Sequence, residues 1–315
     1  MQRVLAVLAA VGMVVAAVMV RGAMDDKDGN GDDGGDGGAA VVVCATDVGD
    51  ACGALGSSVE VRMEDPAITA AAFAEGSVAE DVDAWITSTA WLEVTESRAP
   101  DALGEARAIA TSPATVATAP GRHEAISELC AGDDIWQCLG ASAGADWADL
   151  GDGSHPEWRE LKVGLTDPDL ALGLPVLASA AAGYFEGTDF ATNDLELTEF
   201  DAWLADLADP SASGDADPAR TLATRPGTYS AAGAVGAVAD RLDEQGVQTI
   251  EPDVSVAATI AIVEVEGGDE LPSTDGVREA LEDEGWAGAD GDDLTPTLKP
   301  GVMAALHSLW RTVTT

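Results

Sequence analysis

Strand-like and helix-like segments alternate along the chain from Ala39 onward, and this alternation limits the fold more than any other feature. Short β-branched runs followed by Ala- or Leu-rich stretches predict buried strands and helices in turn. The expected strands lie at 39–45, 59–63, 82–86, 106–110 with a continuation at 115–118, 161–165, 220–223 and 255–266. The expected helices lie at 67–74, 87–94, 122–129, 166–184, 196–207, 228–242, 274–284 and 301–312. Asp65-Pro66 opens the first of these, because Asp caps free N–H groups and Pro fits the first helical position.

Such an order predicts an α/β protein in which helices cover mainly parallel sheets on both faces. Residues 39–315 are too many for one small sheet. Two α/β lobes are therefore expected.

The first 24 residues have the pattern of an N-terminal signal or anchor helix. An uncharged apolar run extends from Val4 to Val20 between Arg3 and Arg21. Its length is at the short end of what spans a bilayer. A cleaved signal peptide needs small residues at −3 and −1, and Val20-Arg21-Gly22 fits this poorly, so an uncleaved anchor is preferred while cleavage stays open. Both interpretations place the remaining residues outside the cytoplasm, tethered to the plasma membrane or secreted.

Residues 25–38 read DDKDGNGDDGGDGG and predict a disordered, acidic, Gly-rich linker. Asp26 to Gly31 matches the start of a calcium-binding loop, D-x-D-x-N-G. Gly37 stands where that loop needs a bidentate Glu, so we predict no metal site here.

The charge balance excludes one class of partner. The chain has 15 Lys and Arg against 57 Asp and Glu, a formal net charge of −42. Nucleic acid carries the same sign of charge, so we expect no nucleic-acid partner. With 46% apolar residues and eight Trp, the chain has enough apolar surface for a large core.

Four cysteines occur as two close pairs, Cys44 with Cys52 and Cys130 with Cys138. Outside the cytoplasm an even number predicts disulfides, and four cysteines allow three connectivities. Proximity in sequence favours Cys44–Cys52 and Cys130–Cys138. A four-thiolate zinc site would need a shorter spacing within each pair, so we predict no metal.

The order of several motifs resembles a known family. These motifs are Val82–Trp91 (VDAWITSTAW), Ala110–Ala117 (ATSPATVA), Trp147–Leu150 (WADL), Lys162–Pro168 (KVGLTDP), Gly173-Leu174 and Thr274–Trp286. Together they resemble type II periplasmic, or extracellular, solute-binding proteins. More specifically, they are similar to the substrate-binding domain that some actinobacterial surface proteins carry ahead of a von Willebrand factor A domain. The similarity covers roughly residues 39–315, and no von Willebrand-type function is carried over, because the chain stops at Thr315.

This resemblance implies a two-lobed type II periplasmic-binding-protein-like fold, with a mixed, mainly parallel sheet in each lobe. Lobe 1 would hold residues 39–112 and 254–315, and lobe 2 residues 113–253. A ligand would be enclosed between the lobes by a hinge motion.

Polar residues at the predicted strand ends, and at the start of the predicted helix 228–242, are the candidate ligand-binding residues, because open α/β sheets bind ligands beyond the carboxyl ends of their strands, where helix N-termini offer free N–H groups. The candidates are Thr46, Asp47, Thr87, Ser88, Thr111, Ser112, Thr166, Asp167, Thr228, Tyr229 and Ser230. Hydroxyls and helix N-termini suit an oxyanion or a carboxylate, whereas the two acids suit a cation, an amine or a sugar hydroxyl. Each residue taken singly is also explained as a helix cap.

An enzyme is the least favoured alternative. Gly140–Gly144 matches the G-x-S-x-G nucleophile elbow, with Ser142 as nucleophile and His155 or His307 downstream. An elbow needs a buried strand before it and a helix after it, and the flanking sequence does not favour either. We therefore predict no catalytic residue and no cofactor.

The sequence thus predicts an extracytoplasmic, membrane-tethered protein that captures a small polar solute. An ABC-type importer or another surface protein is the candidate partner. The main alternative is a cell-surface adhesion or assembly protein on the same scaffold, with a filled cleft and an exposed apolar patch.

Overall fold

The computed structural model describes residues 39–79, 81–209, 215–254, 256–266, 272–289, 294, 298–299 and 301–314. The predicted signal or anchor helix (1–24) and the acidic linker (25–38) lie outside these residues. Within the described ranges, no helix combines the length and the apolar character needed to cross a bilayer.

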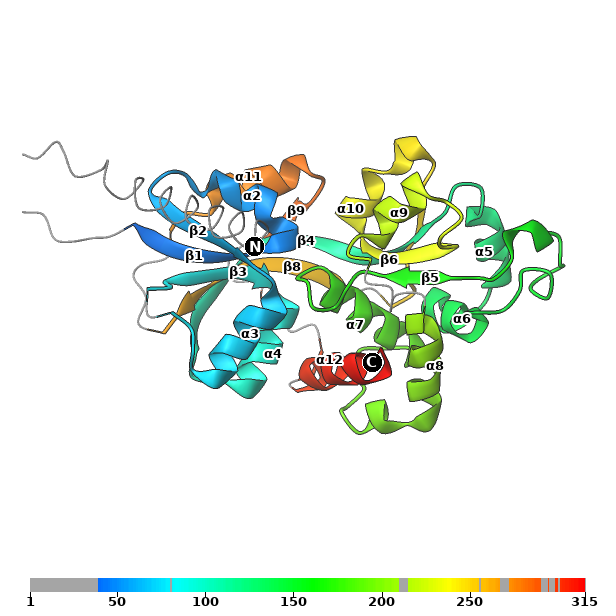
Figure 1. Cartoon of the computed structure of the whole chain (residues 1–315), viewed down its shortest axis with the longest axis horizontal. Helices are drawn as coiled ribbons and strands as arrows, with labels where there is room; N and C mark the ends of the chain where they lie inside the picture. Colours follow the sequence, from blue (N-terminus) through cyan, green and yellow to red (C-terminus); the bar gives the residue numbers. More distant parts are fainter. Residues whose placement is uncertain are drawn as a thin grey trace, which may run out of the picture. The chain divides into compact units, whose positions relative to one another are not determined.

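One mixed sheet of nine strands runs through the described part of residues 39–315 (Figure 1). The strands are β1 (Ala40–Ala45), β2 (Val59–Glu64), β3 (Ala84–Ser88), β4 (Leu103–Thr118), β5 (Val163–Leu165), β6 (Ala231–Val235), β7 (Gln248–Ile250), β8 (Ala257–Val265) and β9 (Ala287–Gly288). They follow the order β2-β1-β3-β8-β4-β6-β5, and β7 and β9 also pair with β4. The predicted α/β class with a mixed sheet is confirmed.

The balance of strand directions differs from the expected one. Three of the described pairings are parallel: β1–β2, β1–β3 and β5–β6. Five are antiparallel, and each of them involves β4 or β8. The sheet is therefore not mainly parallel, because these two strands run against their neighbours.

β4 changes partners along its length. Leu103 to Pro113 pairs with β8, and Ala114 to Thr118 pairs with β6. Pro113 stands at the last residue of the β8 ladder, where its missing N–H costs least. One continuous strand therefore belongs to both halves of the sheet.

Helices cover both faces of each half of the sheet (Figure 1). Around β1, β2 and β3 these are α2 (Gly49–Cys52) and α11 (Asp275–Asp283) on one face, with α3 (Pro66–Glu75) and α4 (Thr89–Arg98) on the other. Around β5 and β6 they are α9 (Pro218–Thr224) and α10 (Gly236–Asp240) on one face, with α6 (Ile135–Ser142), α7 (Gly173–Tyr184) and α8 (Thr198–Ala208) on the other. The remaining helices include α5 (His123–Leu129), α12 (Val302–Val313) and the 3-10 turn η1 (Thr46–Val48).

The predicted strand at 220–223 is wrong, because this segment belongs to helix α9. Asp217 caps the helix by accepting a hydrogen bond from the Arg220 N–H at 2.9 Å, and Pro218 occupies its first turn. This is the Asp-Pro signal that correctly predicted α3 at Asp65-Pro66. The Asp217-Pro218 pair is therefore a stronger indicator of structure at 218–224 than the strand-like composition of 220–223.

The predicted helix at 228–242 is also wrong over most of its length. β6 occupies Ala231–Val235, and only the short α10 follows it. The sequence AAGAV has a composition that fits a helix. Gly233 has a packing reason to lack a side chain: a Cβ there would lie 2.5 Å from Val176 and 2.7 Å from the Trp136 ring. α6, β7 and β9 had no counterpart among the expected elements.

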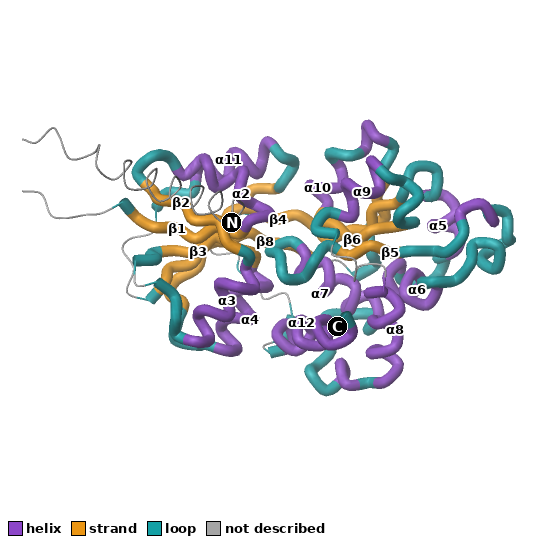
Figure 2. Tube along the Cα trace, in the orientation of Figure 1, coloured by secondary structure: helices purple, strands orange, loops and turns teal. Residues whose placement is uncertain are grey.

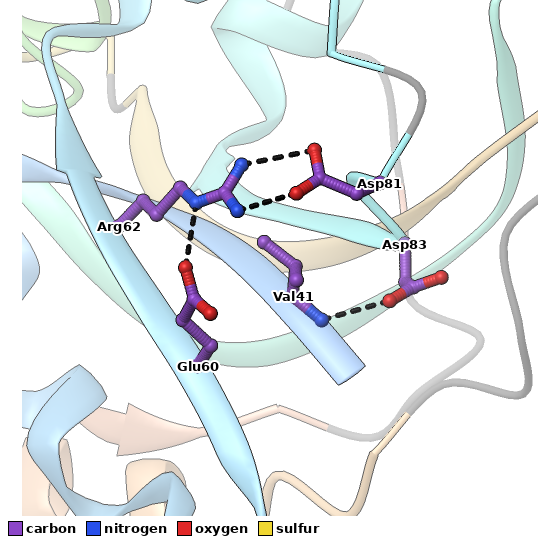
Figure 3. A network of polar contacts seen from close by, with 5 residues as sticks. All are labelled: Val41, Glu60, Arg62, Asp81 and Asp83. Carbon is purple, nitrogen blue, oxygen red and sulfur yellow. Dashed lines mark hydrogen bonds and ion pairs between the residues drawn. The ribbon is translucent and has the colours of Figure 1, made fainter. Parts of the chain in front are cut away.

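An exposed polar network fastens β2 to the turn before β3 (Figure 3). Arg62 donates to both carboxylate oxygens of Asp81, at 3.0 and 2.5 Å, and to Glu60 at 2.9 Å. These hydrogen bonds lower the pKa of Asp81 and raise that of Arg62. Asp83 accepts the Val41 N–H at 2.7 Å, which fixes the start of β1.

Both predicted disulfides, Cys44–Cys52 and Cys130–Cys138, are confirmed. Cys44 lies in β1, next to its last residue, and Cys52 is the last residue of α2. The first disulfide therefore closes the loop that carries Thr46 and Asp47. The second joins the end of α5 to α6.

We expect removal of either disulfide to lower the free energy of unfolding by about 2.5 kcal/mol, because the unfolded chain regains the entropy that the closed loop had removed. The two losses should be equal, since both disulfides join cysteines with a sequence separation of 8. The variants are Cys44→Ala/Cys52→Ala and Cys130→Ala/Cys138→Ala, measured by denaturant unfolding, and each serves as the matched control for the other. A loss below about 1 kcal/mol in both would contradict the chain-entropy origin of the stabilisation.

Candidate functional site

A cavity of about 1000 Å³ opens between the residues that follow β1 and those that follow β5. From the side of β1 and β2 it is lined by the 46–51 loop, Asp65 and the end of α11. From the side of β5 and β6 it is lined by residues 166–172, α9 and the 234–245 region. The lining residues with polar side chains are Thr46, Asp47, Asp50, Asp65, Thr166, Asp167, Asp217, Arg220, Thr224, Arg241, Gln245, Glu284 and Trp286.

Four predicted site residues line this cavity: Thr46, Asp47, Thr166 and Asp167. Thr46 and Asp47 directly follow β1, and Thr166 and Asp167 directly follow β5. The strand-end argument therefore brought together residues that are about 120 positions apart in the sequence.

Four other predicted site residues lie away from the cavity: Thr87 and Ser88 at the end of β3, and Thr111 and Ser112 within β4. Thr87 and Ser88 are fully buried, and their hydroxyls have no hydrogen-bond partner in the described part of the chain. The hydroxyl oxygens of Thr111 and Thr259 lie 3.2 Å apart, and the Ser112 hydroxyl accepts the Ala237 N–H at 3.0 Å. None of these four predicted residues is among those lining the cavity.

Thr228, Tyr229 and Ser230 precede β6 and so lie at its amino end, away from the carboxyl end where the cavity opens. The Ser230 hydroxyl accepts hydrogen bonds from Arg122 at 2.6 Å and from the Trp147 indole at 3.2 Å. Tyr229 is buried in an apolar cluster. They were selected because a helix was expected at 228–242, and its N-terminus would have faced the ligand. A strand begins there instead, so these residues lie at the amino end of a strand, away from the cavity.

Sequence reasoning missed most of the charged groups of the cavity. Asp65 follows β2 directly, but it was assigned only a capping role. Arg220 lies 3.3 Å from Asp217, and Arg241 lies 2.9 Å from Glu284. The Arg241–Glu284 pair joins α10 to the end of α11 across the cavity, and no local sequence signal indicates such a pairing.

Hydrogen bonds make Thr46 and Thr166, two of the three threonines that line the cavity, hydrogen-bond donors. The Thr46 hydroxyl donates to Asp65 at 2.5 Å, and the Thr166 hydroxyl donates to the Gly233 carbonyl at 3.1 Å. Each oxygen is left with lone pairs only. The cavity therefore offers acceptors from these threonines as well as from its carboxylates.

Burial raises the pKa of two cavity carboxyls. Desolvation is the largest cause for Asp47, and hydrogen bonds from the N–H groups of Leu172 and Ala171 offset part of it. Desolvation also raises the pKa of Asp167, and the charges of Asp169 and Asp65 add to this effect. The ionised forms of Asp47 and Asp167 are therefore disfavoured by burial and by the charges of neighbouring carboxylates.

Ser142 does not have the setting of a nucleophile elbow. It is the last residue of α6, so a helix stands where an elbow needs a strand. His155 stacks on Trp158 with ring centroids 3.8 Å apart, and His307 lies 2.7 Å from Asp169. Across the residues that the structure describes, no group of three or more His, Cys, Asp or Glu side chains could hold a metal ion.

No model of a known protein family matches the sequence, and no curated protein matches it. Solved structures do match the fold. Iron-bound HitA from Pseudomonas aeruginosa aligns with a TM-score of 0.57 at 13% identity, over 87% of this chain and 98% of that one. The periplasmic binding protein AfuA from Actinobacillus pleuropneumoniae, with fructose-6-phosphate bound, gives 0.55 at 13% identity over 88% and 96%. Apo ferric ion-binding protein A from Pasteurella haemolytica gives 0.51 at 11% identity over 87% and 95%.

These similarities define the class of fold. Residues 39–315 have the α/β fold of type II periplasmic binding proteins, as the resemblance implied. At 11 to 13% identity the comparison concerns the fold alone.

Two carboxyls that are two residues apart should affect stability in opposite directions. The pKa of Asp167 is raised above the ordinary 3.8, so the folded chain binds its proton more tightly than the unfolded chain does. Stability then falls as the pH rises from 3.8 through the raised pKa. The Asp167→Asn variant should be more stable than the wild type at pH 7, with a shallower fall in this window.

Asp169→Asn is the matched control, because a hydrogen bond from His307 lowers the pKa of Asp169. Its contribution to stability is present above pH 3.8 and is lost as the pH falls through the lowered pKa. Asp169→Asn should therefore be less stable than the wild type at pH 7. Urea unfolding across the pH range measures both, and shifts of the same sign would contradict the assignment.

Proposed function

We propose that this chain is an extracytoplasmic solute-binding protein that captures a small, positively charged polar solute in the cavity, without chemistry. The observation that carries the proposal is the surplus of acceptors around a cavity of about 1000 Å³. A space of this size suits a small organic molecule. The known binding proteins that share the fold support a role in solute capture.

Charge in the cavity favours a cation. Six carboxylates line it, namely Asp47, Asp50, Asp65, Asp167, Asp217 and Glu284. The two lining arginines each pair with an acid, Arg220 with Asp217 and Arg241 with Glu284. A solute with an ammonium group and several N–H donors would fit both the remaining carboxylates and the threonine oxygens.

The rest of the proposal concerns location and partners. The apolar N-terminal run supports tethering to the plasma membrane, or secretion if it is cleaved. An ABC-type importer or a surface assembly is the proposed partner, and the likeness to substrate-binding domains of von Willebrand factor A-associated proteins belongs to this proposal. The adhesion alternative expected a filled cleft, and the open cavity does not favour it.

A thermal-shift titration tests the proposal with 1,4-diaminobutane, glucose and sulfate at one fixed ionic strength. We expect a saturable rise in melting temperature with the diamine and none with sulfate, because binding to the folded state stabilises it by mass action. Fixed ionic strength removes the screening effect of added charge. A saturable response to sulfate alone, or to none of the three probes, would count against a cationic solute.

Thr166→Val should weaken diamine binding about threefold to tenfold, because it removes one hydroxyl acceptor from the cavity wall. Thr115→Val is the matched control: its hydroxyl also donates to a backbone carbonyl, that of Ile250 at 2.9 Å, but it does not line the cavity. Isothermal titration calorimetry measures the affinities. Equal affinity in both variants would assign Thr166 to structure and not to binding.

A further inference from the structure

The segment 166–172, which joins β5 to α7, forms one wall of the cavity and also contacts elements around the other half of the sheet. Thr166, Asp167, Leu170 and Leu172 line the cavity. We call residues 166–172 the connecting segment. It adopts a tight path, since a Cβ on residue 173 would lie 1.9 Å from the Asp167 carbonyl oxygen, and Gly173 avoids this clash.

Three helices hold this segment: α3 and α4 from the other half, and α12, which contacts helices of both halves. The Ala67 N–H of α3 donates to the Asp169 carbonyl at 3.3 Å. The Trp91 indole of α4 donates to the Leu170 carbonyl at 2.9 Å. His307 of α12 lies 2.7 Å from the Asp169 carboxylate. α12 itself packs against α4, α7 and α8 (Figure 2), so it contacts helices from both halves.

Asp47 makes the fourth contact, through its carboxylate at the start of α7. Its carboxylate accepts the Ala171 N–H at 3.2 Å and the Leu172 N–H at 2.8 Å. Asp47 precedes both donors by more than 120 positions in the sequence. α7 has no acidic residue in its first turn, and its N-cap residue, Leu172, has no side-chain cap. The start of this 12-residue helix carries partial positive charge, which a carboxylate stabilises.

We propose that Asp47 is an internal anion: its carboxylate holds the connecting segment and closes the cavity without any bound solute. It also occupies the N–H groups at the start of α7 that an anionic solute would need. An anion must displace Asp47 and is repelled by the other cavity carboxylates, whereas a cation leaves Asp47 in place and is attracted by them. The selectivity for cations rests on the proposed function, but the closure by Asp47 stands without it.

Chemical rescue tests the closure. Spin labels at Glu244→Cys, in the 3-10 turn after α10, and at Glu279→Cys on α11 report the distance across the cavity. All four native cysteines are in disulfides, so only the new thiols react. In Asp47→Ala the distance should lengthen, and formate should restore the wild-type distance in a saturable manner by replacing the missing carboxylate. Chloride at equal ionic strength should not.

Asp50→Ala is the matched control for closure. It removes another carboxylate from the same cavity loop, and Asp50 makes no hydrogen bond to the connecting segment in the described structure. Its label distance should equal that of the wild type with and without formate. The Asp47→Asn variant keeps an acceptor oxygen and should lengthen the distance less than Asp47→Ala.

Two results would overturn the proposal: a wild-type distance in Asp47→Ala, or a longer distance that formate and chloride affect equally. If Asp47→Ala does not fold, formate in the refolding buffer must recover folded protein in a saturable way, and equal recovery in chloride would also overturn it. These measurements add only formate or chloride and contain no diamine. Their failure is therefore distinct from a failed diamine titration, which concerns the proposed function alone.

Discussion

The partner change within β4 is the constraint on which the rest of the structure depends. A single strand of 16 residues pairs with β8 over its first part and with β6 over its last part. Because the strand is continuous, it sets the register of both halves of the sheet together. The carboxyl ends of β1 and β5 then lie on either side of one cavity, and the residues after them become its walls.

Local patterns predicted most of the fold where an element carries its own signal. β1 and β8 are rich in β-branched residues, and α3 has both an N-cap Asp and a Pro in its first turn. β6 could not be predicted in this way. Its Ala and Gly residues have no strand preference of their own, and Val176 and Trp136 from other elements leave no room for a side chain on Gly233.

The candidate site residues also depend on whether the neighbouring strand or helix carries a local sequence signal. Thr46, Asp47, Thr166 and Asp167 follow strands that the sequence predicted correctly, and all four line the cavity. Thr228 to Ser230 do not line it, because they precede a strand, β6, where a helix was expected. The Arg241–Glu284 pair depends on how α10 and α11 approach each other, and pairings between distant segments leave no periodicity in the sequence.

Asp47 connects the fold to the chemistry of the cavity. Helix caps are usually supplied by the residue before the helix, but α7 begins after Leu172, which has no polar side chain. The missing cap is supplied by a loop that the Cys44–Cys52 disulfide closes. Burial raises the pKa of Asp47, so its ionised form is costly unless these N–H groups stay in place. Closure and the charge of Asp47 therefore support each other, and a cationic solute would further stabilise the same charge.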